Sequence, residues 1–221
     1  MELIAEFDKV KALLVDQMIE FGVFLDKTRS TGGKGFRLKL HESRPDAPLS
    51  PFYLEQRRLR GSSNALKIAA DTLASLIRVD DLYRRFDRLA DIPVSISPIV
   101  GILAVQIGKP MVTPRPAKSH GTGATVEGPF EINETILLID DDVTMGDSKL
   151  EAIVVLREQG LVVKDCVVII DREQGGRERL AEVGVTLHAV FGIAEFLNIL
   201  VSAKKLCPEM AAEIRDYLAA N

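Results

Sequence analysis

The sequence predicts an α/β fold with a central, mostly parallel sheet flanked by helices. From Pro98 onward, helical and strand patterns alternate with short turns between them, which is typical of a parallel sheet covered by helices. The apolar run at residues 136–139 and the β-branched segment at residues 162–170 have the composition of strands. A Rossmann dinucleotide site is disfavoured because no GxGxxG sequence follows any predicted strand.

The composition indicates one folded domain. The 221 residues suffice for one substantial core, and 47% hydrophobic with 27% charged residues is typical of a soluble globular protein. A net charge of -4 gives no general attraction to nucleic acid. No apolar run reaches the length of about 18 residues that a membrane span needs, and the N-terminus is acidic, unlike a signal peptide. Cys166 and Cys207 lack metal or CxxC spacing, so we expect reduced thiols in a cytoplasmic protein without membrane or nucleic-acid partners.

The first elements are an amphipathic helix and a basic, turn-rich segment. Residues 1–24 carry apolar side chains at helical spacing, and Gly22 is expected to end this helix. We interpret the helix as packed on its own domain, because its polar face is mixed in sign rather than basic. Residues 26–51 contain many Gly and Pro breakers and one alternating run, residues 36–40, which predicts a hairpin or edge strand beside a loop. The lysines and arginines of this segment either meet a carboxylate substrate or are simply solvated.

The middle of the chain supplies the next helices and strands. Apolar spacing predicts a helix over residues 62–78, a strand within 87–92, a helix over 98–107 and a strand over 109–115. Ser63 or Asn64 is expected to cap the first of these helices, and Gly108 to end the second.

The most informative stretch is residues 135–150, TILLIDDDVTMGDSKL. An apolar run meets three acids, residues 140–142, and turn-forming residues 144–148 follow before a helical pattern resumes. This order predicts a buried strand that ends in a polar loop and opens a helix. Carboxylates accept hydrogen bonds from hydroxyl groups, and the N–H groups of a helix N-terminus favour anions, so the stretch suits a sugar phosphate. An ordinary strand and helix joined by a solvated acidic turn is the alternative.

Two further segments are candidates for function. Residues 115–128, RPAKSHGTGATVEG, combine glycines with Arg115, Lys118 and His120, and long Gly-rich loops are often lids. Residues 171–176, DREQGG, follow a predicted strand at the edge where open α/β sheets bind ligands. The alternatives are a surface hairpin and a simple ion pair. His188 lies in an apolar pattern and is interpreted as a buried structural residue.

These motifs resemble those of type I phosphoribosyltransferases, and most closely those of orotate phosphoribosyltransferases. The resemblance is carried by residues 136–148, which resemble the signature for phosphoribosyl pyrophosphate (PRPP), by SPFYLEQRRL at 50–59, by the loop at 115–121 and by DREQGG with the LHA that follows it. It covers about residues 50–200. It implies the type I phosphoribosyltransferase fold and transfer of the phosphoribosyl group from PRPP to orotate, giving orotidine 5'-monophosphate and pyrophosphate, in pyrimidine biosynthesis. It divides the single domain, residues 1–221, into an N-terminal hood or substrate region at 1–60, a PRPP-binding core at 61–203 and a C-terminal helix at 204–221.

The resemblance also implies roles for individual residues. The residues implied to bind PRPP are Asp140 and Asp141 at the ribose hydroxyls and Thr144, Met145, Gly146, Asp147 and Ser148 at the 5'-phosphate. Those implied to bind orotate are Arg172, Thr144, Lys39, Phe52 and Tyr53. Lys118, with Arg115 and His120, is implied to be the catalytic cation group, on a loop that reaches the neighbouring subunit of a homodimer. Mg2+ is expected to arrive with PRPP, because the sequence has no dedicated carboxylate cage for a metal.

The sequence departs from the family pattern at several positions. Residues 93–97, PVSIS, lack the glycines and lysine usual in the pyrophosphate loop, and Pro116 replaces a lysine. Met145 and Asp147 stand where small or hydroxyl residues are usual, and Asp147 adds a negative charge near a bound phosphate. Two alternatives therefore stay open: a phosphoribosyltransferase for another base, and a regulatory relative that binds PRPP or a nucleotide without turnover.

Overall fold

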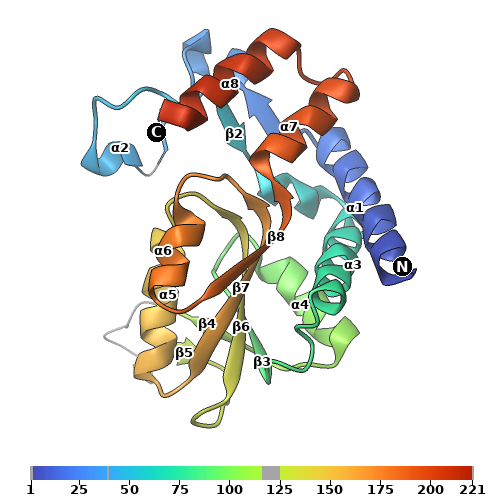
Figure 1. Ribbon diagram of the computed structural model, residues 1–221, viewed down its shortest axis with the longest axis vertical. Helices are drawn as coiled ribbons and strands as arrows, with labels where there is room; N and C mark the ends of the chain where they lie inside the picture. Colours follow the sequence, from blue (N-terminus) through green and yellow to red (C-terminus); the bar gives the residue numbers. More distant parts are fainter. Residues whose placement is uncertain (1, 39, 116–124, 221) are drawn as a thin grey trace.

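The computed structural model describes residues 2–38, 40–115 and 125–220, and it confirms the predicted α/β fold (Figure 1). The strands are β1 (Phe24–Asp26), β2 (Phe52–Leu54), β3 (Arg88–Asp91), β4 (Met111–Pro114), β5 (Val126–Glu127), β6 (Thr135–Val143), β7 (Val162–Asp171) and β8 (Thr186–Gly192). The helices are α1 (Glu2–Glu20), α2 (Leu40–Ser43), α3 (Ser63–Val79), α4 (Ser97–Ile107), α5 (Asp147–Glu158), α6 (Gly176–Glu182), α7 (Ile193–Ser202) and α8 (Pro208–Ala220). Short 3-10 turns cover η1 (Lys27–Arg29), η2 (Thr31–Gly33) and η3 (Gln56–Gly61).

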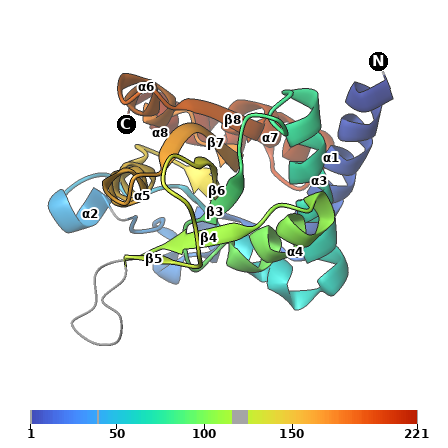
Figure 2. The ribbon, with the colours of Figure 1, turned by 90° about the horizontal axis from the view of Figure 1, so that it is seen from below.

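The main sheet has the strand order β5-β4-β3-β6-β7-β8, and its pairs are parallel except for β4 with β5. Helices α3 and α4 lie on one face and α5 and α6 on the other (Figures 1 and 2). The small antiparallel sheet of β1 and β2 lies with α7 and α8 at one end of the molecule.

The alternation of side chains along β6 builds two cores. Leu137 and Ile139 join the core that includes α1, α3, α4 and α7, whereas Ile136 and Leu138 join the core that includes α5 and α6. Successive residues of a strand point to opposite faces, so one apolar run serves both helix layers. This explains why the run contains no polar residue.

The predicted helix ends are largely confirmed. Gly22 follows α1 in the left-handed conformation at φ 61°, and Gly108 ends α4 at φ 65°, a backbone region that glycine occupies readily. The predicted cap of α3 is wrong by one position. The N-cap is Ser62, whose extended backbone lets its side chain accept a hydrogen bond from the Ala65 N–H at 3.3 Å.

The predicted strand at residues 36–40 is wrong. Among the described residues of this segment the structure has a single bridge between Phe36 and Ser50, followed by the short helix α2. The His41 ring contacts backbone groups that a strand would pair with its neighbour. Its Nδ1 accepts a hydrogen bond from the Leu38 N–H at 2.8 Å, and its Nε2 lies 3.3 Å from the Pro48 carbonyl. A side chain that satisfies the backbone in this way favours a compact loop over a strand.

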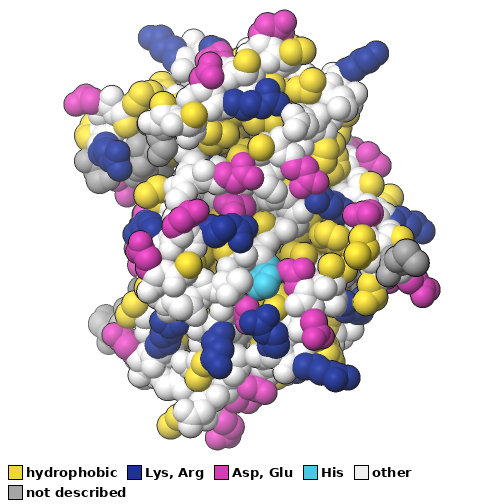
Figure 3. All heavy atoms as spheres, viewed as in Figure 1, with side chains coloured by type: hydrophobic (Ala, Val, Ile, Leu, Met, Phe, Trp, Pro, Cys, Tyr) yellow, Lys and Arg dark blue, Asp and Glu magenta, His cyan; other side chains and the backbone are white. Residues whose placement is uncertain are grey.

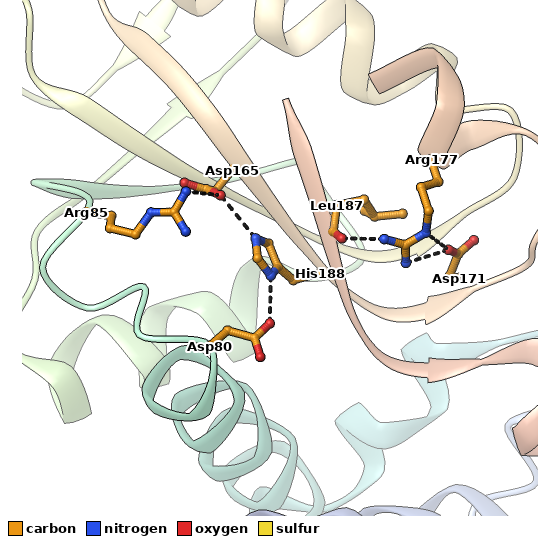
Figure 4. A network of polar contacts seen from close by, with 7 residues as sticks. All are labelled: Asp80, Arg85, Asp165, Asp171, Arg177, Leu187 and His188. Carbon is orange, nitrogen blue, oxygen red and sulfur yellow. Dashed lines mark hydrogen bonds and ion pairs between the residues drawn. The ribbon is translucent and has the colours of Figure 1, made fainter. Parts of the chain in front are cut away.

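His188 lies partly buried and ties α3 to the sheet, in agreement with its structural interpretation. Its Nδ1 lies 2.6 Å from Asp80 Oδ2, and its Nε2 lies 3.0 Å from Asp165 Oδ1, which also pairs with Arg85 (Figure 4). Burial is less complete than predicted, because β8 is an edge strand and one side of the ring is not covered by another strand.

The described helices and one face of the molecule (Figure 3) were compared with the features of membrane spans and nucleic-acid surfaces. In the part of the chain that the structure describes, every helix is too short or too polar to cross a membrane. The face in Figure 3 carries Lys and Arg side chains intermixed with Asp and Glu. That face therefore lacks the continuous basic surface that attracts nucleic acid.

Candidate active site

A cavity of about 660 Å³ lies at the carboxyl edge of the main sheet. Its lining comes from the ends of three strands and from the N-terminal segment. The lining residues are 140–142 and 144–149 at and after β6, 92–95 after β3, Arg172 after β7, and Leu38, Glu42, Tyr53, Leu54, Gln56 and Arg57. Parallel strands bring their carboxyl ends to one edge, which is where open α/β sheets bind ligands.

The acids belong to β6 itself rather than to a loop. Asp140 pairs with Val168, and Asp142 with Ile170, so the strand continues to Val143. The prediction of a strand ending before the acids is therefore wrong, because the backbone ladder with β7 outlasts the apolar run. The consequence is that the carboxylates are held on a rigid strand end.

The Asp140 carboxylate is buried and held at both oxygens by protein groups. Its Oδ1 accepts from the Asp141 N–H at 2.8 Å, and its Oδ2 lies 2.5 Å from Lys149 Nζ. Burial raises the pKa of Asp140 well above its ordinary value, against the opposing charge of Lys149. Burial also raises the pKa of Asp142, and the charge of Asp141 acts in the same direction.

The loop from Thr144 to Ser148 leads directly into α5. Gly146, at φ 80°, occupies the N-cap position, so the loop places backbone N–H groups of the first helical turn at the cavity. The negative charge of Asp147 is compensated by Arg179, which is distant in the sequence but close in space. Arg179 Nη1 lies 2.7 Å from Asp147 Oδ1 and donates a hydrogen bond to the Met145 carbonyl at 2.6 Å. The unusual acid of this loop therefore binds α6.

Arg172 is a buried cation with unused hydrogen-bond donors. Its side chain lies 4.5 Å from the centroid of the fully buried Phe52 ring, and its Nε and Nη2 have no hydrogen-bond partner among the described residues. Burial lowers the pKa of the guanidinium, and the charge of Asp142 opposes this effect. Buried donors without acceptors are costly, so a ligand with acceptor oxygens is expected at this point of the cavity.

Asp171, the residue before Arg172, forms its ion pair with Arg177 of α6 and not with the adjacent Arg172. Asp171 accepts from Arg177 Nη2 at 3.0 Å, and Arg177 Nη1 donates to the Leu187 carbonyl at 2.6 Å (Figure 4). Asp171 therefore fixes the DREQGG loop to α6 and β8, and it leaves Arg172 free for the cavity.

Residues 93–95 of the PVSIS segment line the cavity, without any glycine. Arg60, from η3, donates to the Ser95 carbonyl at 3.1 Å and also to the Val94 carbonyl. Asp91 accepts from the hydroxyls of Ser97 and Thr113, which fixes the end of β3. The PVSIS segment is thus held by Arg60 from η3 and by the contact of its own Ser97 with Asp91 at the end of β3.

Other predicted residues lie away from the cavity or outside the described residues. Lys39, Lys118 and His120 belong to the latter group. Arg115 is described, and it forms an ion pair with Glu127 across β4 and β5 at 2.7 Å without lining the cavity. Phe52 lies beneath Arg172 and Tyr53 lines the cavity.

The cavity lining includes Gln56, Arg57 and Lys149, to which the sequence prediction assigned no role. Gln56 donates to the Asp141 carbonyl at 2.7 Å, Arg57 follows it, and Lys149 pairs with Asp140. Gln56 and Arg57 fall within the SPFYLEQRRL segment, so the family resemblance included their segment but assigned them no role. Nothing in the helical pattern marked Lys149.

No metal cluster is evident in the ranges that the structure describes. They contain no group of three or more His, Cys, Asp or Glu side chains placed to hold a metal ion.

Comparison with known proteins gives a consistent result, although no protein-family model matches the chain. It is 37% identical over 162 residues to the orotate phosphoribosyltransferase of Cenarchaeum symbiosum, covering 70% of this chain and 78% of that protein. It is 33% identical over 156 residues to the uridine 5'-monophosphate synthase of Caenorhabditis elegans, covering 70% of this chain. The structure of Leishmania donovani UMP synthase is similar with a TM-score of 0.78 at 26% identity, covering 94% of this chain. The chain spans 31% and 42% of the lengths of these two synthases.

Proposed function

We propose that this chain, which belongs to the orotate phosphoribosyltransferase family, transfers the phosphoribosyl group of PRPP to orotate. The products are orotidine 5'-monophosphate and pyrophosphate, and the reaction belongs to pyrimidine biosynthesis. The observation that carries the proposal is that one cavity combines acids at a strand end, a helix N-terminus and the unpaired donors of Arg172.

The sugar phosphate is proposed to bind between β6 and α5. Asp140 and Asp141 accept hydrogen bonds from the ribose hydroxyls, and residues 144–148 receive the 5'-phosphate at the positive end of the α5 dipole. The pairing of Asp147 with Arg179 supports this assignment, because it reduces the repulsion between the Asp147 carboxylate and a phosphate.

Orotate is proposed to bind against Arg172. A guanidinium offers directional donors that match a carboxylate or a pair of carbonyl oxygens, and orotate presents both. Phe52 supports the guanidinium from behind, while Tyr53 and Thr144 line the same cavity. Lys39, which resemblance alone assigns to the base, completes the proposed set.

The leaving pyrophosphate is proposed to lie near residues 92–95 and the loop at 115–128. Positive charge develops on the ribose and negative charge on pyrophosphate as the bond breaks, so cations beside the leaving group stabilise the transition state. We assign this role to Lys118, with Arg115 and His120. Mg2+ is proposed to enter bound to the oxygens of PRPP and to neutralise part of the charge of the leaving group.

The decisive experiment is a PRPP-dependent assay with a panel of bases. We expect orotate to be consumed and pyrophosphate released, with uracil and purines turned over far more slowly. Turnover of another base in preference to orotate would contradict the proposed substrate. Binding of PRPP without turnover of any base would support a regulatory protein instead.

The assembly is proposed to be a homodimer in which the loop at 115–128 serves the neighbouring site. Helix α4 supports this proposal, because its Val105 is 84% exposed. We place this exposed valine in the proposed interface. We keep the division into residues 1–60, 61–203 and 204–221 as a proposal, and we propose the cytoplasm as the location, on the basis of the two free cysteines.

Val105→Asp is expected to convert the dimer to a monomer. A carboxylate buried at the centre of an interface costs about 2 kcal/mol or more, which weakens association by roughly 30-fold. Light scattering after size-exclusion chromatography measures the mass of each variant. The matched control is Val154→Asp, since Val154 is also an exposed helical valine but lies on α5, on the opposite face of the sheet. A monomeric parent chain, or an unchanged dimer in Val105→Asp, would contradict this assembly.

A further inference from the structure

Lys149 is a buried lysine in the floor of the cavity. It is the third residue of α5, and its side chain is 5% exposed. Its Nζ lies 2.5 Å from Asp140 Oδ2 and also donates a hydrogen bond to the Asp142 carbonyl. A lysine at this position of a helix would ordinarily extend into solvent, so its burial against β6 indicates a specific function.

Burial and neighbouring charges act in opposite directions on the pKa values of this pair. Burial alone would lower the pKa of Lys149, but the charges of Asp140 and Asp142 outweigh that effect and raise it. The opposite holds for Asp140, where burial raises the pKa of the carboxyl and Lys149 is the largest influence that lowers it. The charged or titratable groups that act on the pair are Asp141 and Asp142 on β6 and Cys166 on β7, and Arg172 after β7 acts on Asp142. Cys166 is a neutral thiol, because burial raises its pKa to about 12.

The charge state of Asp140 matters for binding a sugar. An ionised carboxylate accepts hydrogen bonds at both oxygens, whereas a protonated carboxyl becomes a donor at one of them. Ribose hydroxyls already bring their own donors, so protonation of Asp140 would remove an acceptor that the proposed function needs. A carboxyl this deeply buried keeps its charge only beside a cation.

We infer that Lys149 is a positioning residue for the proposed reaction, which holds the Asp140 carboxylate ionised and oriented for the ribose hydroxyls. The inference rests on the proposed function for the ligand, but it rests on the geometry of Lys149 and Asp140 for the charge state. These two parts are tested separately.

The first test observes the carboxyl directly in the full chain without any ligand. Carbon-13 labelled aspartate allows the Asp140 carboxyl signal to be followed against pH, and its absence in Asp140→Asn assigns it. In Lys149→Met, which keeps the length of the side chain without its charge, we expect the titration midpoint to rise by at least about one pH unit. Lys149→Arg is expected to keep the parent midpoint. An unchanged midpoint in Lys149→Met overturns the inference.

The second test follows the kinetic consequence with PRPP. In Lys149→Met we expect kcat/KM for PRPP to fall about tenfold or more at pH 6 and to recover as pH rises and Asp140 ionises. Lys149→Arg is expected to restore the parent pH profile. The double variant Asp140→Asn with Lys149→Met should lose no more than Asp140→Asn alone. A loss that is uniform across pH, or additive in the double variant, overturns the positioning role.

The two tests separate the possible failures. If no base is turned over, the proposed function fails, yet the carboxyl titration still decides whether Lys149 holds Asp140 ionised. If Lys149→Met does not fold, circular dichroism shows it, and the double variant then becomes informative. Removing both members of a buried ion pair leaves no uncompensated charge, so the double variant should fold. Failure of the double variant to fold would show that the pair is structural and would overturn the inference.

Discussion

Replacement of Arg172 by methionine is expected to abolish orotate turnover while leaving the fold at least as stable as the parent. The change removes the Nε and Nη2 donors, which no described protein group uses. Loss of a buried charged partner costs a ligand about 2–5 kcal/mol, so kcat/KM for orotate should fall by roughly 30-fold to several thousand-fold. The fold avoids the cost of a buried cation, and an apolar side chain of similar length can pack on Phe52. Steady-state kinetics and thermal unfolding measure the two effects.

Arg85→Met is the matched control for this prediction. Arg85 is paired with an acid, Asp165, and it lies in the network around His188, outside the cavity. Its replacement should leave turnover unchanged and lower stability slightly, the reverse of the expected result for Arg172→Met. The variant Arg172→Lys should not restore activity, because an ammonium lacks the planar fork of donors. Orotate turnover within tenfold of the parent in Arg172→Met would remove Arg172 from the base site.

The strands of the sheet were predictable because a strand that is buried on both faces has an uninterrupted run of apolar residues. The run at residues 136–139 supplies side chains to both cores, so every position is apolar and the strand is visible. The end of that strand was not predictable, because Asp140 and Asp142 pair with Val168 and Ile170 through backbone groups alone. Backbone pairing beyond the apolar run depends on the neighbouring strand, and no local pattern reports it.

The polar contacts of the site were hidden for a related reason. Asp147 and Arg179 are 32 positions apart, and Asp171 pairs with Arg177 rather than with the adjacent Arg172. Periodicity treats such residues as solvated, because it contains no information about which loops meet. Lys149 is the clearest case, since a lysine in a helical pattern is read as exposed although here it is buried. The motifs identified the acids and Arg172, whereas the residues that pair with the acids could be identified only from the structure.

Gly176→Ala is expected to damage the proposed phosphate loop from a position outside it. Gly176 begins α6, and a Cβ added there would lie 2.5 Å from the Thr144 carbonyl oxygen and 2.5 Å from Val143 Cγ2. The Thr144 backbone and the Val143 side chain at the end of β6 cannot move away without a large cost in free energy. Helix α6 and the loop at residues 144–148 must therefore separate. Overpacking of this kind costs about 1–3 kcal/mol, which lowers Tm by roughly 2–12 °C for a chain of this size. We also expect kcat/KM for PRPP to fall about tenfold or more, because the loop is proposed to place its N–H groups against the 5'-phosphate.

Gly192→Ala separates this effect from the general cost of adding a methyl group at a glycine. Its new Cβ would meet the carboxylate end of Glu173, and that end of a flexible side chain can rotate away. We therefore expect near-parent PRPP kinetics and a smaller loss of stability than in Gly176→Ala. If Gly176→Ala instead loses stability but keeps its kcat/KM for PRPP, the loop tolerates displacement and residues 144–148 do not position the phosphate. If Gly176→Ala lowers both the stability and kcat/KM for PRPP, the contact between Gly176 and Thr144 couples the DREQGG loop to the proposed phosphate site. The same packing contact then positions both the base end and the sugar-phosphate end of the cavity.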